Sequence, residues 1–130
     1  VALLSHAERK KVGAVLERDG NILAFGYNGT PTGWDNCCEE YAPIIDHGDE
    51  LISVTKREVL HAESNAIAKL ASSHESGKNA TLLCTHAPCI ECAKLIYQSG
   101  ISTVYYKDAY RSSVGIEFLK KSKVKVIHND

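Results

Sequence analysis

The sequence predicts a single layered α/β domain with a mixed β-sheet. Three observations predict this fold class. The chain has 130 residues, which suits one hydrophobic core. Its apolar residues form short strand-like runs in some segments and recur at helical spacing in others. Helical segments also separate the last three strand-like runs, so we expect those strands to be parallel neighbours joined by right-handed crossovers.

The first half of the chain predicts the end of a helix, a hairpin and a long loop. Residues 1–10 have the pattern of an amphipathic helix, and the sequence contains no Met, so we expect that the beginning of this helix is missing. Strands are expected at 12–16 and 22–25, because they flank Asp19-Gly20, a strong hairpin signal. From Gly26 to about Thr55 regular periodicity fails, as in many functional loops.

The second half predicts helices and strands in alternation. Apolar residues recur at helical spacing from His61 until Gly77, which predicts a helix there. The remaining elements are expected in this order: a strand at 81–85, a helix from just after Pro88 to near Gly100, a strand at 103–106, a helix at about 113–121 and a strand at 124–128.

The charge balance excludes two classes of partner. Fifteen Lys and Arg residues stand against 16 Asp and Glu residues, a formal net charge of −1. A general polyanion binder or a membrane-surface protein needs a cationic excess, whereas a small anionic ligand remains compatible. No apolar run approaches the roughly 18 to 20 residues that cross a bilayer, and no leader pattern opens the chain. We therefore expect a cytoplasmic protein.

Two short segments carry the candidate chemistry. One contains His61 and Glu63, and the other contains Pro88, Cys89 and Cys92. One imidazole and two thiolates suit tetrahedral Zn²⁺, and three protein ligands leave the fourth position open for water, as in catalytic sites. Cys89 and Cys92 are three residues apart, so both sulfurs face the same way on a first helical turn. His61 and Glu63 are two apart and can reach one site only at a helix entrance.

The five cysteines leave an alternative open. An odd number favours reduced thiols or metal ligands over a disulfide framework. A closed structural zinc site would need a fourth ligand, and Cys37, Cys38, Cys84 or His86 could supply it. Cys84 and His86 precede Pro88 on a predicted strand whose geometry turns them elsewhere.

His-x-Glu followed by Pro-Cys-x-x-Cys is the signature of zinc-dependent nucleobase deaminases. The sequence resembles the cytidine deaminase superfamily over essentially its whole length, and within it the deoxycytidylate (dCMP) deaminases. The resembling segments are 12–15, 26–33, 36–38, 61–67, 88–94 and 98–101. The zinc segments are shared by the superfamily, whereas Gly-Tyr-Asn-Gly-x-Pro-x-Gly at 26–33 narrows the resemblance to the dCMP deaminases. The resemblance implies a three-layer α-β-α fold with a five-stranded mixed sheet whose last two strands are parallel.

The resemblance also implies a reaction, the hydrolysis of dCMP to dUMP and ammonia, which supplies dUMP for thymidylate synthesis. His61, Cys89 and Cys92 are then the ligands of one catalytic Zn²⁺ per subunit, which activates the water that attacks C4 of cytosine. Glu63 is the expected proton carrier to N3 and N4. Glu91 is the competing carboxylate, but its helix position points away from the sulfurs.

Contacts to the base and sugar are expected from four residues. The resemblance implies that Asn28 contacts the sugar, with a turn residue in left-handed φ as the alternative. The backbone of Ala87 and Pro88 is expected to approach the base. Tyr105 and Tyr106 alternate faces of a strand, so one belongs to the core, and we expect Tyr106 to wall the pocket.

The 5′-phosphate needs cations or N–H donors. Lys107, Tyr110 and Arg111 follow the fourth strand, at the carboxyl end where ligand crevices form. Solvated surface is the alternative for Lys107 and Arg111.

Regulation and assembly are implied by the resemblance alone. It implies a homohexamer that dCTP with Mg²⁺ activates and dTTP inhibits, with effectors bound near Asn28, Gly29 and Thr30. Trp34 is then a lid or a partner contact. Cys37 and Cys38 are expected to be reduced loop thiols, although some relatives hold a second structural zinc.

Two other functions stay open. One is another deaminase of the superfamily, acting on tRNA adenosine or a free base, although the net charge of −1 provides no basic flank for tRNA. The other is a zinc-stabilised nucleotide-binding module without activity.

Overall fold

The computed structural model describes residues 1–43, 51–110 and 112–129. The elements, in chain order, are η1 (Ala2–Leu4), β1 (Gly13–Arg18), β2 (Asn21–Tyr27), β3 (Glu39–Pro43), β4 (Leu51–Thr55), α1 (Ala62–Ala71), β5 (Thr81–His86), α2 (Ile90–Gln98), β6 (Thr103–Asp108), α3 (Val114–Lys121) and β7 (Lys125–His128).

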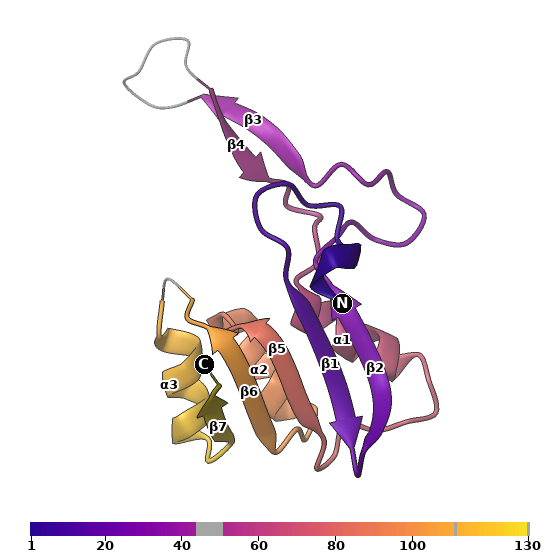
Figure 1. Cartoon of the computed structure of the whole chain (residues 1–130), viewed down its shortest axis with the longest axis vertical. Coiled ribbons are helices and arrows are strands. Elements are labelled where there is room, and N and C mark those ends of the chain that lie inside the picture. Colours follow the sequence, from indigo (N-terminus) through magenta and orange to yellow (C-terminus); the bar gives the residue numbers. More distant parts are fainter. Residues whose placement is uncertain (44–50, 111, 130) are drawn as a thin grey trace.

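Five strands form one mixed sheet in the order β2-β1-β5-β6-β7 (Figure 1). β1 pairs antiparallel with β2 and with β5, whereas β5, β6 and β7 pair in parallel. This confirms the predicted five-stranded mixed sheet with its last two strands parallel. Because β2 and β5 both run antiparallel to β1, the carboxyl ends of β2, β5, β6 and β7 meet at one edge of the sheet.

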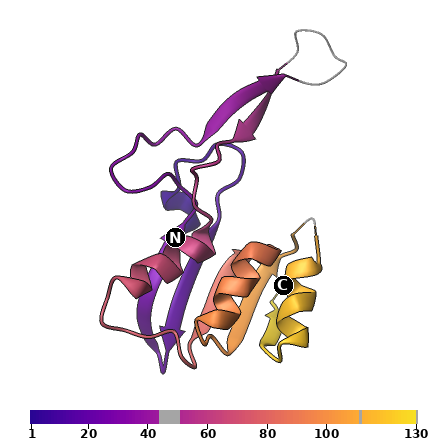
Figure 2. The ribbon, with the colours of Figure 1, turned by 180° about the vertical axis from the view of Figure 1, so that it is seen from behind.

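The three α-helices lie side by side on one face of the sheet (Figure 2). α1 packs against β2 and β1, and α2 packs against α3. The described residues therefore supply the sheet and one helical layer of the predicted three-layer arrangement. None of the helices in this part of the chain is long and apolar enough to span a bilayer.

The core lies between the sheet and these helices. Leu16, Leu82 and Val104 are fully buried residues of adjacent strands, and they meet Ile96 of α2 and Leu119 of α3. Side chains alternate between the two faces of a strand, so these apolar residues turn one face of the sheet towards the helices. This packing brings the amino-terminal ends of α1 and α2 close to the ends of the strands.

The predicted hairpin is confirmed. β1 and β2 are joined at Asp19 and Gly20, whose φ angles are 53° and 83°. Positive φ at both central residues is the geometry of the tight turns that suit a twisted hairpin. The Asp-Gly pair therefore produces the turn that it predicted.

Two predicted segments differ from the structure. The helix over residues 1–10 is wrong beyond Leu4, since Ser5 already has an extended backbone and its hydroxyl donates a hydrogen bond to the Asn28 carbonyl at 2.6 Å. The helix predicted from 61 to 77 ends at Ala71. Just after it, the Ser73 hydroxyl donates to the Leu70 carbonyl at 2.6 Å, and such local bonds compete with the helical ladder.

The loop predicted from Gly26 to Thr55 contains regular structure. β3 and β4 pair antiparallel as a separate two-stranded sheet, which projects from the body of the molecule (Figure 1). The prediction of an irregular segment is therefore wrong for 39–43 and 51–55. Each strand has only five residues and pairs outside the main sheet, so neither carries the long alternating pattern of a strand on the core.

Candidate active site

Three predicted metal ligands converge at the amino-terminal ends of α1 and α2. His61 and Cys89 immediately precede these helices, and Cys92 lies in the first turn of α2. Nδ1 of His61 is 3.4 Å from the Sγ atoms of both Cys89 and Cys92, and all three ligand atoms lie within 4.8 Å of one another. The spacing therefore brings these residues to one point, as predicted.

The chemistry of the three side chains fits a divalent, thiophilic cation. Hydrogen bonds from Cys92 and His61 hold the pKa of Cys89 well below its usual range, which favours the thiolate form of this sulfur. The hydrogen bond with Cys89 raises the pKa of His61, and the hydrogen bond with Cys89 together with burial raises the pKa of Cys92. Two sulfurs and one imidazole nitrogen with this geometry form a set of ligands for Zn²⁺.

The alternative fourth ligands do not join this group. Among the described residues, only His61, Cys89 and Cys92 come together as a metal-ligating set. Cys84 is buried in the core, and its thiol donates to the Tyr105 carbonyl at 3.4 Å. Three protein ligands leave a coordination position open, which is the arrangement of catalytic zinc sites.

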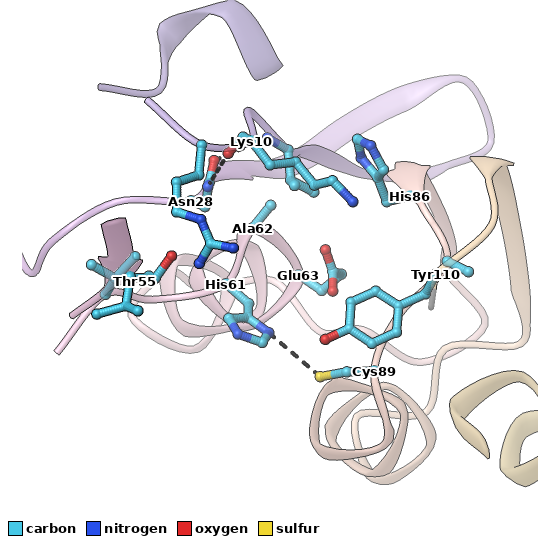
Figure 3. Close-up of a pocket in the computed structure, with 14 residues that line it drawn as sticks. Lys10, Asn28, Thr55, His61, Ala62, Glu63, His86, Cys89 and Tyr110 are labelled. Carbon is cyan, nitrogen blue, oxygen red and sulfur yellow. Dashed lines mark hydrogen bonds between the residues drawn. The ribbon is translucent and has the colours of Figure 1, made fainter. Parts of the chain in front are cut away.

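Glu63 lies beside these ligands in the first turn of α1. It is only 4% exposed, and burial raises the pKa of its carboxyl. Figure 3 shows the carboxylate directed into the cavity near Cys89. A raised pKa brings a carboxyl closer to the range in which it can both accept and donate a proton.

Glu91, the competing carboxylate, has a different environment. It is exposed, and its carboxylate pairs with the Lys94 ammonium at 3.0 Å. The structure confirms that it belongs to the solvated face of α2.

A cavity of about 510 Å³ opens over these residues. Much of its wall comes from residues at the strand ends of the main sheet, namely Val12, Asn28, His86, Ala87 and Tyr110. A further part comes from Val54, Thr55 and Val59 at the base of the β3–β4 hairpin. The cavity therefore lies at the carboxyl edge of the parallel strands, where ligand crevices form in open α/β sheets.

Asn28 lines this cavity and is bonded to the segment that leads into β1. Its Oδ1 accepts a hydrogen bond from the Val12 backbone N–H at 2.9 Å. Its Nδ2 donates to the Lys10 carbonyl at 2.7 Å. The side chain predicted to contact a sugar thus also holds Lys10 in place.

Among the other predicted substrate contacts, Ala87 and Tyr110 line the cavity, whereas Pro88 and Tyr106 do not. Pro88 is fully buried and lies under α3, where its carbonyl would be 2.2 Å from a Cβ added at Gly115. Tyr106 packs against the core and stacks on His128 with ring centroids 4.6 Å apart, so it does not line the cavity.

One of the two predicted phosphate cations, Lys107, is not brought to the site. The Lys107 side chain is exposed and lies outside the cavity wall. Arg111 lies outside the described residues. Instead, the wall contains Arg9 and Lys10, which belong to the segment 1–10 that was predicted to be the end of an amphipathic helix. The signal that could have found them is their position immediately before β1, at the same edge as Asn28.

A second, smaller cavity of about 180 Å³ adjoins the Gly-rich loop. Gly29, Thr30 and Trp34 line it, together with Lys69 of α1. Asn28 faces the first cavity, so the three residues predicted to bind effectors divide between the two cavities.

Comparisons with known proteins agree with this geometry. Residues 1–108 match the family described as the cytidine and deoxycytidylate deaminase zinc-binding region. The chain is 40% identical over 107 residues to the deoxycytidylate deaminase of Saccharomyces cerevisiae, covering 82% of this chain and 34% of that protein. It is 38% identical over 112 residues to ComE operon protein 2 of Bacillus subtilis, covering 86% and 56%. The chain thus spans about a third of the length of the first relative and just over half of the length of the second.

A solved structure is also similar over nearly the whole chain. It is the dCMP deaminase of the cyanophage S-TIM5 in complex with dCMP and dUMP, with a TM-score of 0.85 and 42% identity. The similarity covers 98% of this chain and 88% of that one.

Proposed function

Because the chain belongs to the cytidine and deoxycytidylate deaminase family, we propose that it hydrolyses dCMP to dUMP and ammonia. The observation that carries this proposal is the buried Glu63 beside the His61, Cys89 and Cys92 ligand set, in a cavity of about 510 Å³. The similar cyanophage structure binds dCMP and dUMP, which supports the same substrate here.

His61, Cys89 and Cys92 would hold Zn²⁺ in this mechanism. When bound, the ion supplies the Lewis acid that makes a water molecule nucleophilic near neutral pH. Glu63 takes a proton from the attacking water and delivers it to N3 of cytosine as the bond to C4 forms. Glu63 then passes the second proton of that water to N4, so that the C4–N4 bond breaks and ammonia leaves. Ala87, which is buried, forms part of the wall beside these transfers.

An ultraviolet assay of deamination tests the substrate. The expected order of kcat/KM places dCMP above deoxycytidine, dCTP and cytosine. Equal rates with deoxycytidine and dCMP would overturn the claim that the monophosphate is the substrate. Activity on a tRNA adenosine with none on dCMP would favour the alternative deaminase. Binding of dCMP without turnover of any of these compounds would favour the non-catalytic module.

We also propose that dCTP with Mg²⁺ activates the enzyme and dTTP inhibits it, in a cytoplasmic homohexamer that supplies dUMP for thymidylate synthesis. The resemblance at residues 26–33 supports this proposal, and the cavity at Gly29 and Thr30 offers a place for an effector. Sedimentation and dCMP assays with each effector test it. A monomer whose rate neither nucleotide alters would contradict it.

A further inference from the structure

The geometry points to Arg9 and Lys10 as the cations that bind the 5′-phosphate of the substrate. This inference rests on the proposed function and goes beyond it, because it identifies the residues that distinguish a nucleotide from a nucleoside. It replaces Lys107, whose side chain lies outside the cavity.

The charges along the cavity wall support an anionic group at this end of the ligand. Apart from the metal-centre residues His61, Glu63 and Cys89, the charged side chains in the described wall are Arg9 and Lys10. Within the described residues, neither cation forms an ion pair or a side-chain hydrogen bond. Two cations without an acidic partner, facing one cavity, leave their donors available for a phosphate.

The charge of Lys10 reaches into the cavity. Figure 3 shows its side chain extending along the wall towards His86, with Glu63 between Lys10 and Cys89 in that view. Burial and the nearby charge of Lys10 both lower the pKa of His86. A ligand whose base lies at Glu63 and the metal centre therefore meets Lys10 on another side of the same cavity.

The backbone that carries both cations is held in place. One oxygen of Glu39, Oε1, accepts hydrogen bonds from the N–H groups of Glu8 at 2.8 Å and Arg9 at 3.2 Å. Asn28 donates to the Lys10 carbonyl and accepts from the Val12 N–H. Clamping on both sides reduces the ordering that phosphate binding would otherwise require.

Alanine substitutions test the assignment with two substrates. We expect Arg9→Ala and Lys10→Ala each to lower kcat/KM for dCMP roughly tenfold to a hundredfold, the range for losing a hydrogen bond to a charged group. The loss is expected mainly in KM. Deoxycytidine has no phosphate, so its kcat/KM is expected to stay within about twofold of the wild-type value.

Lys11→Ala and Lys107→Ala are the matched controls. Both residues are exposed lysines outside the cavity wall, and their variants are expected to keep wild-type kcat/KM for dCMP. A thermal melt checks that every variant folds. Equal losses with dCMP and deoxycytidine would overturn the inference, and so would a loss confined to Lys107→Ala.

Calorimetry separates this inference from the proposed function. If the wild-type protein deaminates none of the cytosine compounds, the proposed function fails, but its affinities for dUMP and deoxyuridine still test the subsite. We expect Arg9→Ala and Lys10→Ala to weaken dUMP binding and leave deoxyuridine binding unchanged. Unchanged dUMP binding in both variants would overturn the inference.

Discussion

Individual residues decide the chemistry, and Glu63 is the sharpest example. Glu63→Gln keeps the size of the side chain and removes its ability to carry a proton. We expect kcat for dCMP to fall by about 10² to 10⁴, the usual contribution of general acid–base catalysis, while zinc content measured by atomic absorption stays at the wild-type level.

Glu91→Gln is the control for this substitution. Glu91 lies between the metal ligands Cys89 and Cys92 in the sequence, but its carboxylate faces solvent and pairs with Lys94. This variant is expected to retain the wild-type kcat. A Glu63→Gln enzyme with undiminished turnover would support the non-catalytic module instead.

Asn28 offers a second test at this scale, since it was predicted to contact the sugar and is observed to hold Lys10. If its main role is to position Lys10, Asn28→Ala will raise KM for dCMP severalfold and spare deoxycytidine. If it binds the sugar, kcat/KM will fall for both substrates. Steady-state kinetics with both compounds distinguish the two roles.

The sequence predicts some site residues and not others for a physical reason. His61, Glu63, Cys89 and Cys92 are residue types whose spacing is limited by ligand geometry, so the pattern alone indicates their role. Arg9 has no such pattern, because an exposed cation before a strand is usually solvated. Its backbone contact with Glu39, 30 residues away in the chain, helps to fix its place at the cavity, and no local pattern reveals that contact.

At the scale of elements, α3 packs on the segment that contains Pro88 and Cys89, here called the metal loop. This packing predicts that a larger residue at Gly115 destabilises the protein. A Cβ added at Gly115 would lie 2.2 Å from the Pro88 carbonyl oxygen and 2.9 Å from the Cys89 carbonyl carbon. The backbone of the metal loop or of α3 would have to move. Gly115→Ala is therefore expected to lower the free energy of unfolding by about 1–3 kcal/mol, the cost typical of overpacking, and to weaken zinc retention.

Thermal or chemical denaturation together with competition for zinc by a chelator measures both effects. Gly29→Ala is the control for stability, because a Cβ there has open space and the residue has no positive φ. Equal stability and zinc affinity for Gly115→Ala and the wild type would show that the contact does not constrain the metal loop.

The elements also show where pattern analysis succeeds. The strands of the main sheet were predicted because apolar residues such as Leu82 and Val104 pack on one face. β3 and β4 were not predicted, because among the described strands they pair only with each other and carry no core-facing alternation. These two strands position groups at the site, because the base of this hairpin supplies both Glu39 and part of the cavity wall.

For the molecule as a whole, the active site depends on elements that are distant in the chain. His61 and Cys92 are 31 residues apart, and each lies at the beginning of a different helix. The spacing of the motifs predicted that these ligands meet. The cavity that connects them to Arg9 and Lys10 depends instead on the pairing of β1, β2 and β5. A metal bound between α1 and α2 therefore links two parts of the fold.

Metal removal tests this link through the accessibility of the thiols. Cys37 is exposed, whereas Cys38 and Cys84 are buried, so in the zinc-bound protein we expect alkylation at Cys37 alone. After treatment with a chelator, Cys89 and Cys92 lose their protection and are expected to react next, and the melting temperature is expected to fall because ligand binding to the native state stabilises it. Peptide mass spectrometry identifies the modified positions.

Two outcomes would change this interpretation. If Cys89 and Cys92 are labelled as fast with zinc as without it, they are not ligands. If Cys84 is labelled at the same time, the whole core opens when the metal leaves.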